Sequence, residues 1–129
     1  MPAVKHKPIR KRITVPIYRA KVWVVVVDDI EVERKRKRWV QMFGQPSPSL
    51  VNCDGLCSHS GGCTFALFFS RGALKMRIVA HEVFHLTHDI MNWVGEDFAY
   101  QHQEPFAYLN GILMEEVHRI VTRDRKLMW

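Results

Sequence analysis

A run of six apolar residues, Val22 to Val27, constrains the fold of this chain more than any other segment. Five of the six are valines, whose branched side chains favour strands, and an unbroken apolar run is typical of a strand buried on both faces. The run is far too short to cross a bilayer. With 47% hydrophobic and 11% aromatic residues, the chain has the composition of a soluble globular protein rather than a disordered one.

The rest of the chain predicts one domain that contains both strands and helices. Its 129 residues are enough for one hydrophobic core and too few for two. Residue patterns predict strands at 13–18, 21–28 and 64–69, and helices at 30–43, 73–94 and from 105 to about 120. Residues 1–12 are expected to be a basic tail ahead of a single domain at 13–129, and residues 52–62 an irregular loop rich in Gly, Ser and Cys. The fold class we expect is α+β, with a mixed sheet of three to four strands.

Charge is unevenly distributed along the chain, whose formal net charge is +6. The stretch from His81 to Val117 contains seven carboxylates and four histidines, but no Lys or Arg. Such a stretch favours a divalent cation over a polyanion. Basic residues cluster instead at 5–12, 34–38 and 123–126. We interpret these clusters either as solvated surface or as a contact for nucleic acid or an acidic partner.

The residues that carry chemistry are His81-Glu82-Val83-Phe84-His85, inside the first long predicted helix. Positions four apart lie on one face of an α-helix, so the two imidazoles can converge on one ion. A catalytic zinc site needs a third protein donor and leaves one position for water. Glu82 lies beside the pair, where it could take a proton from that water. The alternative is a histidine-rich helix packed in the core without a metal.

Glu104 is the candidate third ligand. It follows His85 after eighteen residues, and it shares one face of the last predicted helix with Tyr108 and Gly111. Because Gly111 has no side chain, this face is expected to approach the neighbouring helix closely.

The spacing and surroundings of these ligands resemble those of the gluzincin metallopeptidases, which combine HExxH with a glutamate on a second helix. The residues that match are His81, Glu82, His85, Glu104, Phe106 and Ala107. In its size and in the residues around both motifs, the chain is also similar to small uncharacterised minigluzincin-like proteins of phages and prophages.

The resemblance implies a zincin-like fold, in which the sheet packs on the active-site helix and a C-terminal helix carries the second part of the ligand set. It implies that His81, His85 and Glu104 bind Zn²⁺, and that Glu82 activates a zinc-bound water to hydrolyse a peptide bond. It also implies that an edge strand above the helix binds the substrate peptide as an extra antiparallel strand. The candidate for this edge strand is the segment Thr64 to Phe69. The alternative is that this segment forms an interior strand of the sheet.

Several further residues are candidates for supporting roles at such a site. They are Tyr108, His102 and Tyr100 as oxyanion donors, His88 and Asp89 as residues that line the pocket or orient a ligand, and Glu96 and Asp97 as alternative third ligands.

A compact set of soft donors precedes the motif helix and consists of Cys53, Cys57, His59 and Cys63. Four such donors could close a second, structural zinc site, and the alternative is a loop with free thiols. Three cysteines cannot all pair, and the basic N-terminus has no apolar segment behind it. We therefore expect a cytoplasmic location, in the host cell if the protein is phage-encoded.

Two functions follow from these residues. The first is a zinc metallopeptidase that acts on a peptide or protein. The second is a non-catalytic, zinc-containing phage or prophage module that contacts nucleic acid or a partner protein through its basic segments. Neither function requires a membrane.

Overall fold

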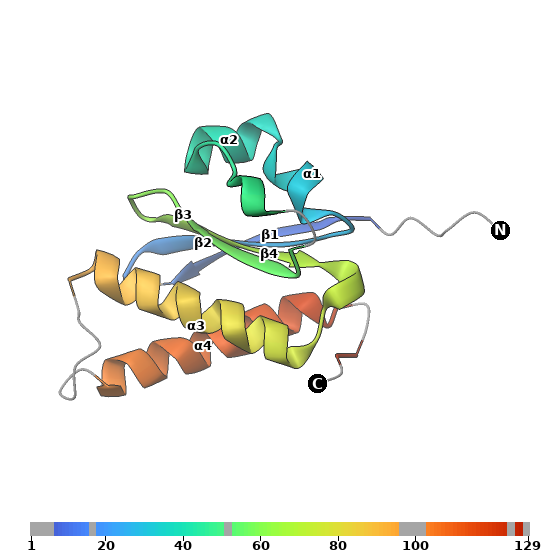
Figure 1. Cartoon of the computed structure of the whole chain (residues 1–129). Coiled ribbons are helices and arrows are strands. Elements are labelled where there is room, and N and C mark those ends of the chain that lie inside the picture. The colour runs from blue at the N-terminus through green and yellow to red at the C-terminus, as the bar shows by residue number, and fades with distance from the viewer. Residues whose placement is uncertain (1–6, 16–17, 51–52, 96–102, 124–125, 128–129) are drawn as a thin grey trace.

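The computed structural model is built on a four-stranded mixed sheet (Figure 1). It describes residues 7–15, 18–50, 53–95, 103–123 and 126–127. The strands lie in the order β1-β2-β4-β3, with β2 and β4 parallel and the two outer pairs antiparallel. Their bounds are β1 Ile9–Val15, β2 Ala20–Val27, β3 Gly55–His59 and β4 Thr64–Ser70. The predicted α+β class with a mixed sheet is confirmed.

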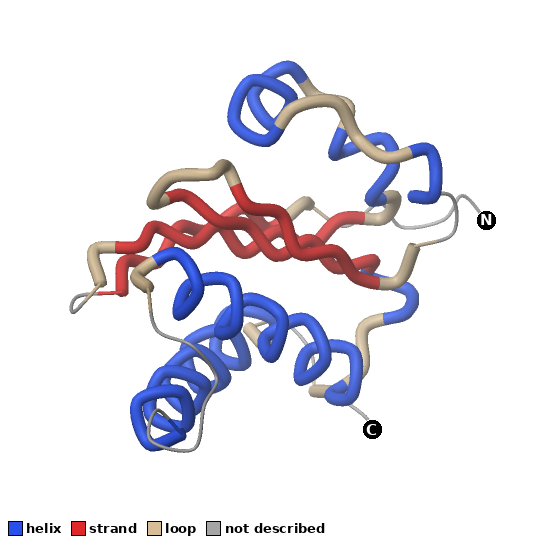
Figure 2. Tube along the Cα trace, turned by 60° about the vertical axis from the view of Figure 1, so that its left-hand side comes forward, coloured by secondary structure: helices blue, strands red, loops and turns tan. Residues whose placement is uncertain are grey.

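Helices cover both faces of this sheet (Figure 2). The two long helices, α3 and α4, lie on one face, and the short helices α1 and α2 lie on the other. The bounds are α1 Ile30–Arg34, α2 Lys37–Phe43, α3 Met76–Trp93 and α4 Gln103–Val121, with 3-10 helices at Pro48–Leu50 and Arg71–Ala73. The sheet is therefore the middle layer of three.

The side chains of β2 alternate between two cores. Val22, Val24 and Val26 pack in the larger core with residues of α3 and α4, whereas Val25 and Val27 pack in the smaller core with residues of α1 and α2. All five valines are buried. The prediction of a strand buried on both faces is confirmed.

The predicted helix over residues 30–43 is in fact two helices, because the chain leaves helical geometry at Arg36, where φ is −62° and ψ is 142°. The break brings Glu33 and Trp39 together: Trp39 is fully buried, and its Nε1 donates a hydrogen bond to Glu33 Oε2 at 2.7 Å. In one continuous helix these two side chains would point about 120° apart. Val32 of α1 is 66% exposed.

Three predictions about the strands also need correction. β1 begins at Ile9, so residues 9–12 pair with β2 and are not part of a tail. Residues 55–59, expected in an irregular loop, form β3, which pairs with β4. Since β4 then has a strand on each side, it is interior, and the edge strand beside α3 is β3. The expectation that Thr64 to Phe69 forms the edge strand is wrong, and the alternative of an interior strand is confirmed.

Within the described residues, no helix combines the length and the apolar character that crossing a membrane requires. The cytoplasmic location stays a prediction.

Candidate metal centre

The pair formed by His81 and His85 lies on the exposed face of α3. The opposite face of this helix is fully buried and carries Val79, Val83, Leu86 and Ile90. These apolar residues recur every three or four positions, so their burial fixes which face of the helix is open to solvent. The same hydrophobic pattern that forms the core therefore orients the two imidazoles outward.

The two rings converge on each other. The Nε2 atoms of His81 and His85 lie 3.1 Å apart, and the ring centroids lie 4.7 Å apart. Two nitrogens bound to one tetrahedral zinc ion at 2.0–2.1 Å would be roughly 3.3 Å apart. The pair therefore fits the separation that a shared ion requires. The contact also requires that one nitrogen lack its proton, because an N–H can donate only to a bare ring nitrogen.

Glu82 is buried between α3 and β3, with 8% of its surface exposed. Burial raises the pKa of its carboxyl above the ordinary value of 4.5, although His81 and His85 oppose this by favouring the charged form. Its Oε1 lies 4.0 Å from Nε2 of His81. A carboxylate with a raised pKa beside a histidine pair is typical of a general base.

The edge strand β3 lies along α3 and covers Glu82. Contact is closest at Gly55, where an added Cβ would lie 2.8 Å from Cγ of Glu82. Further along the strand, Sγ of Cys57 donates a hydrogen bond to Oδ2 of Asp89 at 3.6 Å. A cavity of about 320 Å³ opens between the two elements and is lined by Gly55, Leu56, Cys57, Glu82, His85 and Asp89. The buried carboxylate and one of the two histidines therefore face the same cavity beside the edge strand.

Glu104 lies in the first turn of α4, and its side chain is exposed. This part of α4 packs beside the histidine pair, since the rings of Phe106 and Phe84 are 5.4 Å apart. Across the described ranges, however, no three His, Cys, Asp or Glu side chains gather in a way that could hold a metal ion. The structure brings His81 and His85 together but does not place Glu104 with them.

The face of α4 that carries Glu104 is exposed rather than packed on α3. Tyr108 is 71% exposed, and an added Cβ at Gly111 would meet nothing within 4 Å. The prediction that Gly111 allows a close helix approach is wrong. Instead, α4 packs through its apolar face, and Oγ1 of Thr87 on α3 donates a hydrogen bond to Oδ1 of Asn110 on α4 at 2.9 Å.

Two of the other predicted site residues, His88 and Asp89, also lie on α3. Asp89 lines the cavity together with His85, and His88 is exposed on α3. Four candidates lie outside the described residues, namely Glu96, Asp97, Tyr100 and His102.

The four donors of the predicted second zinc site are all described, and they are not gathered. Cys53 packs in the core beside α1 and α2, and its Sγ donates to a backbone carbonyl of β3 at 2.8 Å. Cys57 packs on the opposite side of the sheet, against the core beside α3 and α4. His59 stacks on an aromatic ring of β4, and Cys63 is exposed. The structure does not bring these four donors together, and the three cysteines are free thiols.

Cys57 is held in its thiol form beside the candidate centre. Burial raises its pKa, and the carboxylates of Asp89 and Glu82 raise it further. Because a cysteine binds metal as the thiolate, this environment disfavours Cys57 as a ligand.

The close contact of Gly55 with Glu82 could not be predicted from the sequence, because it depends on β3 lying against α3. One signal in the sequence does point to this strand. The four residues between β3 and β4 include Gly61, with φ of +86°, and Gly62, and a short glycine-containing loop is typical of a hairpin.

The chain matches no family model, no curated protein and no solved structure. The resemblance to gluzincins therefore depends on the motif residues alone.

Proposed function

We propose that this protein is a zinc-dependent metallopeptidase of the gluzincin type. His81 and His85 bind the ion together with Glu104, and Glu82 is the general base. The observation that carries this proposal is the convergence of two imidazole nitrogens to 3.1 Å beside a buried carboxylate. A histidine pair that served only to pack the helix would be buried in the core, whereas these two rings are exposed.

Glu104 is proposed as the third donor because α4 reaches α3 near the motif. The ring contact between Phe84 and Phe106 joins the residue before His85 to the second residue after Glu104. Both histidines and Glu104 are exposed, which leaves their side chains free of competing packing. Ion binding is expected to draw the carboxylate toward the pair.

Glu82 is suited to move a proton during hydrolysis. A bound zinc ion would polarise the scissile carbonyl and lower the pKa of water at the site. The carboxylate of Glu82 takes the proton from the attacking water and passes it to the leaving amine. Since burial raises the pKa of Glu82, its basicity is closer to that needed at neutral pH than the basicity of a solvated glutamate.

The outer edge of β3, the last strand of the sheet formed by the described residues, is the proposed substrate platform. An extended peptide can pair with this edge through backbone hydrogen bonds, as an added antiparallel strand. The cavity between β3 and α3 then lies under the peptide, with Glu82 and His85 in its wall. Backbone pairing would hold many sequences, so we expect broad cleavage of unfolded polypeptides.

Three variants test the proposal, with zinc content and cleavage of a fluorogenic unfolded protein as the two measurements. Glu82→Gln should keep its zinc and lose cleavage by about 10²- to 10⁴-fold. His85→Ala should lose both. His118→Ala, which removes an exposed histidine of α4, is the matched control and should change neither.

The same measurements separate the peptidase from a non-catalytic zinc module. If the wild-type protein binds zinc and cleaves no unfolded protein, the site is structural and the peptidase proposal is wrong. If cleavage survives in Glu82→Gln, the assignment of the general base is wrong.

A further inference from the structure

A second surface, on the opposite side of the sheet, has the character of a polyanion contact. Two segments contribute to it, the edge strand β1 and the junction of α1 with α2 (Figure 1). We name this surface the basic face and define it by Arg10, Arg12, Lys35, Arg36, Lys37 and Arg38. The candidate metal centre lies on α3, below the other face of the sheet.

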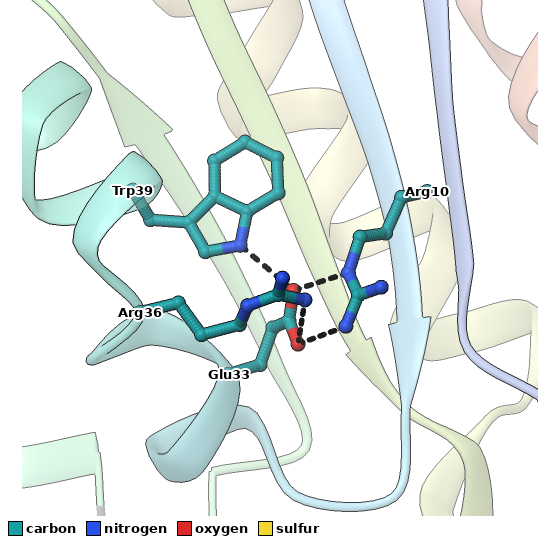
Figure 3. Close-up of polar contacts among 4 residues, drawn as sticks. All are labelled: Arg10, Glu33, Arg36 and Trp39. Atoms are coloured by element: carbon teal, nitrogen blue, oxygen red, sulfur yellow. Dashed lines mark hydrogen bonds and ion pairs between the residues drawn. The ribbon is translucent and has the colours of Figure 1, made fainter.

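A buried carboxylate fixes the two segments to each other (Figure 3). Arg10 of β1 makes two hydrogen bonds to Glu33, from Nε at 2.7 Å and from Nη2 at 2.8 Å. Nη1 of Arg36 lies 3.6 Å from Oε1 of Glu33, and Nε1 of Trp39 donates to Oε2 at 2.7 Å. One carboxylate thus faces two guanidiniums, so the cluster keeps a surplus positive charge in a rigid position.

Trp23 holds two further arginines in place. The guanidinium carbon of Arg38 lies 4.7 Å from the centroid of the Trp23 ring, and that of Arg12 lies 5.9 Å from it. Arg38 is also 4.7 Å from the ring centroid of Trp39. Ring contacts of this kind orient a guanidinium without using its N–H groups. Within the described part of the chain, neither Arg12 nor Arg38 has an acceptor for those N–H groups.

The charge balance of this face points to an anionic partner. Its six cations are accompanied by Glu31 and Glu33, each already ion-paired with a cation of the face. Asp28 and Asp29 lie at one end of the face, where they line a cavity with Arg10, and both are engaged: Asp28 lies 3.8 Å from Arg71, and Asp29 caps α1. The segment from His81 to Val117, which includes the metal centre, has seven carboxylates and no Lys or Arg. A polyanion would therefore be steered toward the basic face and away from the histidine pair.

The chemistry of the face favours nucleic acid over an acidic protein. Protein interfaces have an apolar centre. Here Val32 is the one exposed large apolar side chain on this side, because the other exposed ones in the described ranges lie on α3 and α4. Arg12 and Arg38 are the arginines best placed to contact phosphates, because Nε and Nη2 of Arg10 already donate to Glu33.

A duplex fits this face better than a single strand. Proteins that hold single strands stack bases on exposed aromatic rings. The Trp23 ring is covered by guanidiniums and Trp39 is fully buried, so neither offers such a platform. We propose that the basic face binds the phosphate backbone of a nucleic-acid duplex without reading its sequence.

The test is the fluorescence anisotropy of a short labelled DNA duplex, titrated with the full-length chain between roughly 50 and 200 mM salt. Arg12→Gln/Arg38→Gln should weaken binding tenfold or more and lower the slope of log K against log salt by about 1.8, for two lost phosphate contacts. The matched control is Arg77→Gln/Arg119→Gln, which removes the same charge from exposed positions of α3 and α4 and should change affinity less than twofold. Lys35→Gln/Lys37→Gln leaves the Trp23 packing intact and should also weaken binding, which keeps the test valid if the arginine variant unfolds.

Two duplexes of unrelated sequence should bind equally. Equal losses in the basic-face and control variants would contradict the proposal, because net charge alone would then explain the binding. Tighter binding of a single strand of the same sequence would overturn the duplex assignment. Displacement of the duplex by polyglutamate at matched charge concentration would favour an acidic protein instead.

Discussion

A Cβ atom added to Gly55 would lie 2.8 Å from Cγ and 3.1 Å from Oε1 of Glu82. The backbone of the edge strand therefore rests directly on the carboxylate that we assign as the general base. This contact explains how a glutamate on an exposed helix face is almost fully buried, and it links the position of the strand to the pKa of the carboxyl.

Gly55→Ala should destabilise the fold by about 1–3 kcal/mol, because the added methyl overpacks the contact with Glu82. Urea denaturation measures the change. Gly72→Ala is the control, since a Cβ there meets nothing within 4 Å. The double variant Gly55→Ala/Glu82→Ala is compared with Glu82→Ala alone. Without the Glu82 side chain, the added methyl should cost much less stability. Equal destabilisation with and without the Glu82 side chain would show that the clash does not exist.

Glu82→Gln should stabilise the protein at neutral pH by about 0.5–2 kcal/mol. Because the pKa of Glu82 is raised in the folded chain, the contribution of this group is favourable below the ordinary value of 4.5 and is lost as pH rises through the folded pKa. Glutamine mimics the protonated form, so the gain should vanish below about pH 4.5. Thermal unfolding at several pH values checks this. The control is Glu115→Gln, which changes an exposed glutamate of α4. A gain that persists unchanged in acid would contradict the burial of a charged carboxylate.

Glu33→Gln should have the opposite effect. Burial alone would raise the pKa of Glu33, but the hydrogen bonds from Arg10 and Trp39 and the charges of Arg10 and Arg36 together lower it. A lowered pKa means that the group stabilises the fold above its unfolded pKa and that this contribution is lost as pH falls through the folded value.

The expected loss for Glu33→Gln at neutral pH is about 3 kcal/mol, the lower end for breaking a buried ion pair, because Arg10 keeps partial access to solvent. Glu31→Gln removes an exposed pair on the same helix and should cost less than about 1 kcal/mol. Chemical denaturation of both variants provides the comparison. Equal losses would mean that the Glu33 network does not join β1 to α1.

Gly111→Ala distinguishes the exposed position of this glycine from the close helix approach expected from the sequence. Since an added Cβ meets nothing within 4 Å, alanine should stabilise α4 by about 0.5–1 kcal/mol. Thermal unfolding at neutral pH measures the shift. A fall in stability would indicate that this face of α4 lies close to α3, as the sequence predicts.

The sequence predicts well the elements whose burial pattern is local. The apolar repeat of α3 predicts both the helix and the outward position of His81 and His85. The repeat forms one apolar stripe that faces the core, and the two histidines lie on the side of the helix away from that stripe. The valine run of β2 likewise predicts its own burial on two faces. In both cases the signal lies within the element itself.

Elements whose structure depends on partners elsewhere in the chain were predicted poorly. Gly55 to His59 has little strand preference of its own, and pairing with β4 makes it a strand. The break at Arg36 accompanies the hydrogen bond from Trp39 to Glu33, and Glu33 in turn pairs with Arg10, which lies 23 residues away. The position of Glu104 relative to the histidine pair depends in the same way on how α4 packs, which spacing along the chain does not specify.

Zinc titration of the metal-free full-length chain, followed by calorimetry, tests the central claim most directly. We predict one tightly bound ion per chain, a loss of affinity of at least about 100-fold in His81→Ala and in His85→Ala, and a clear loss in Glu104→Gln but not in Glu115→Gln. Absence of zinc binding, or binding that persists when His81 and His85 are both replaced, would contradict the metal centre and the peptidase built on it.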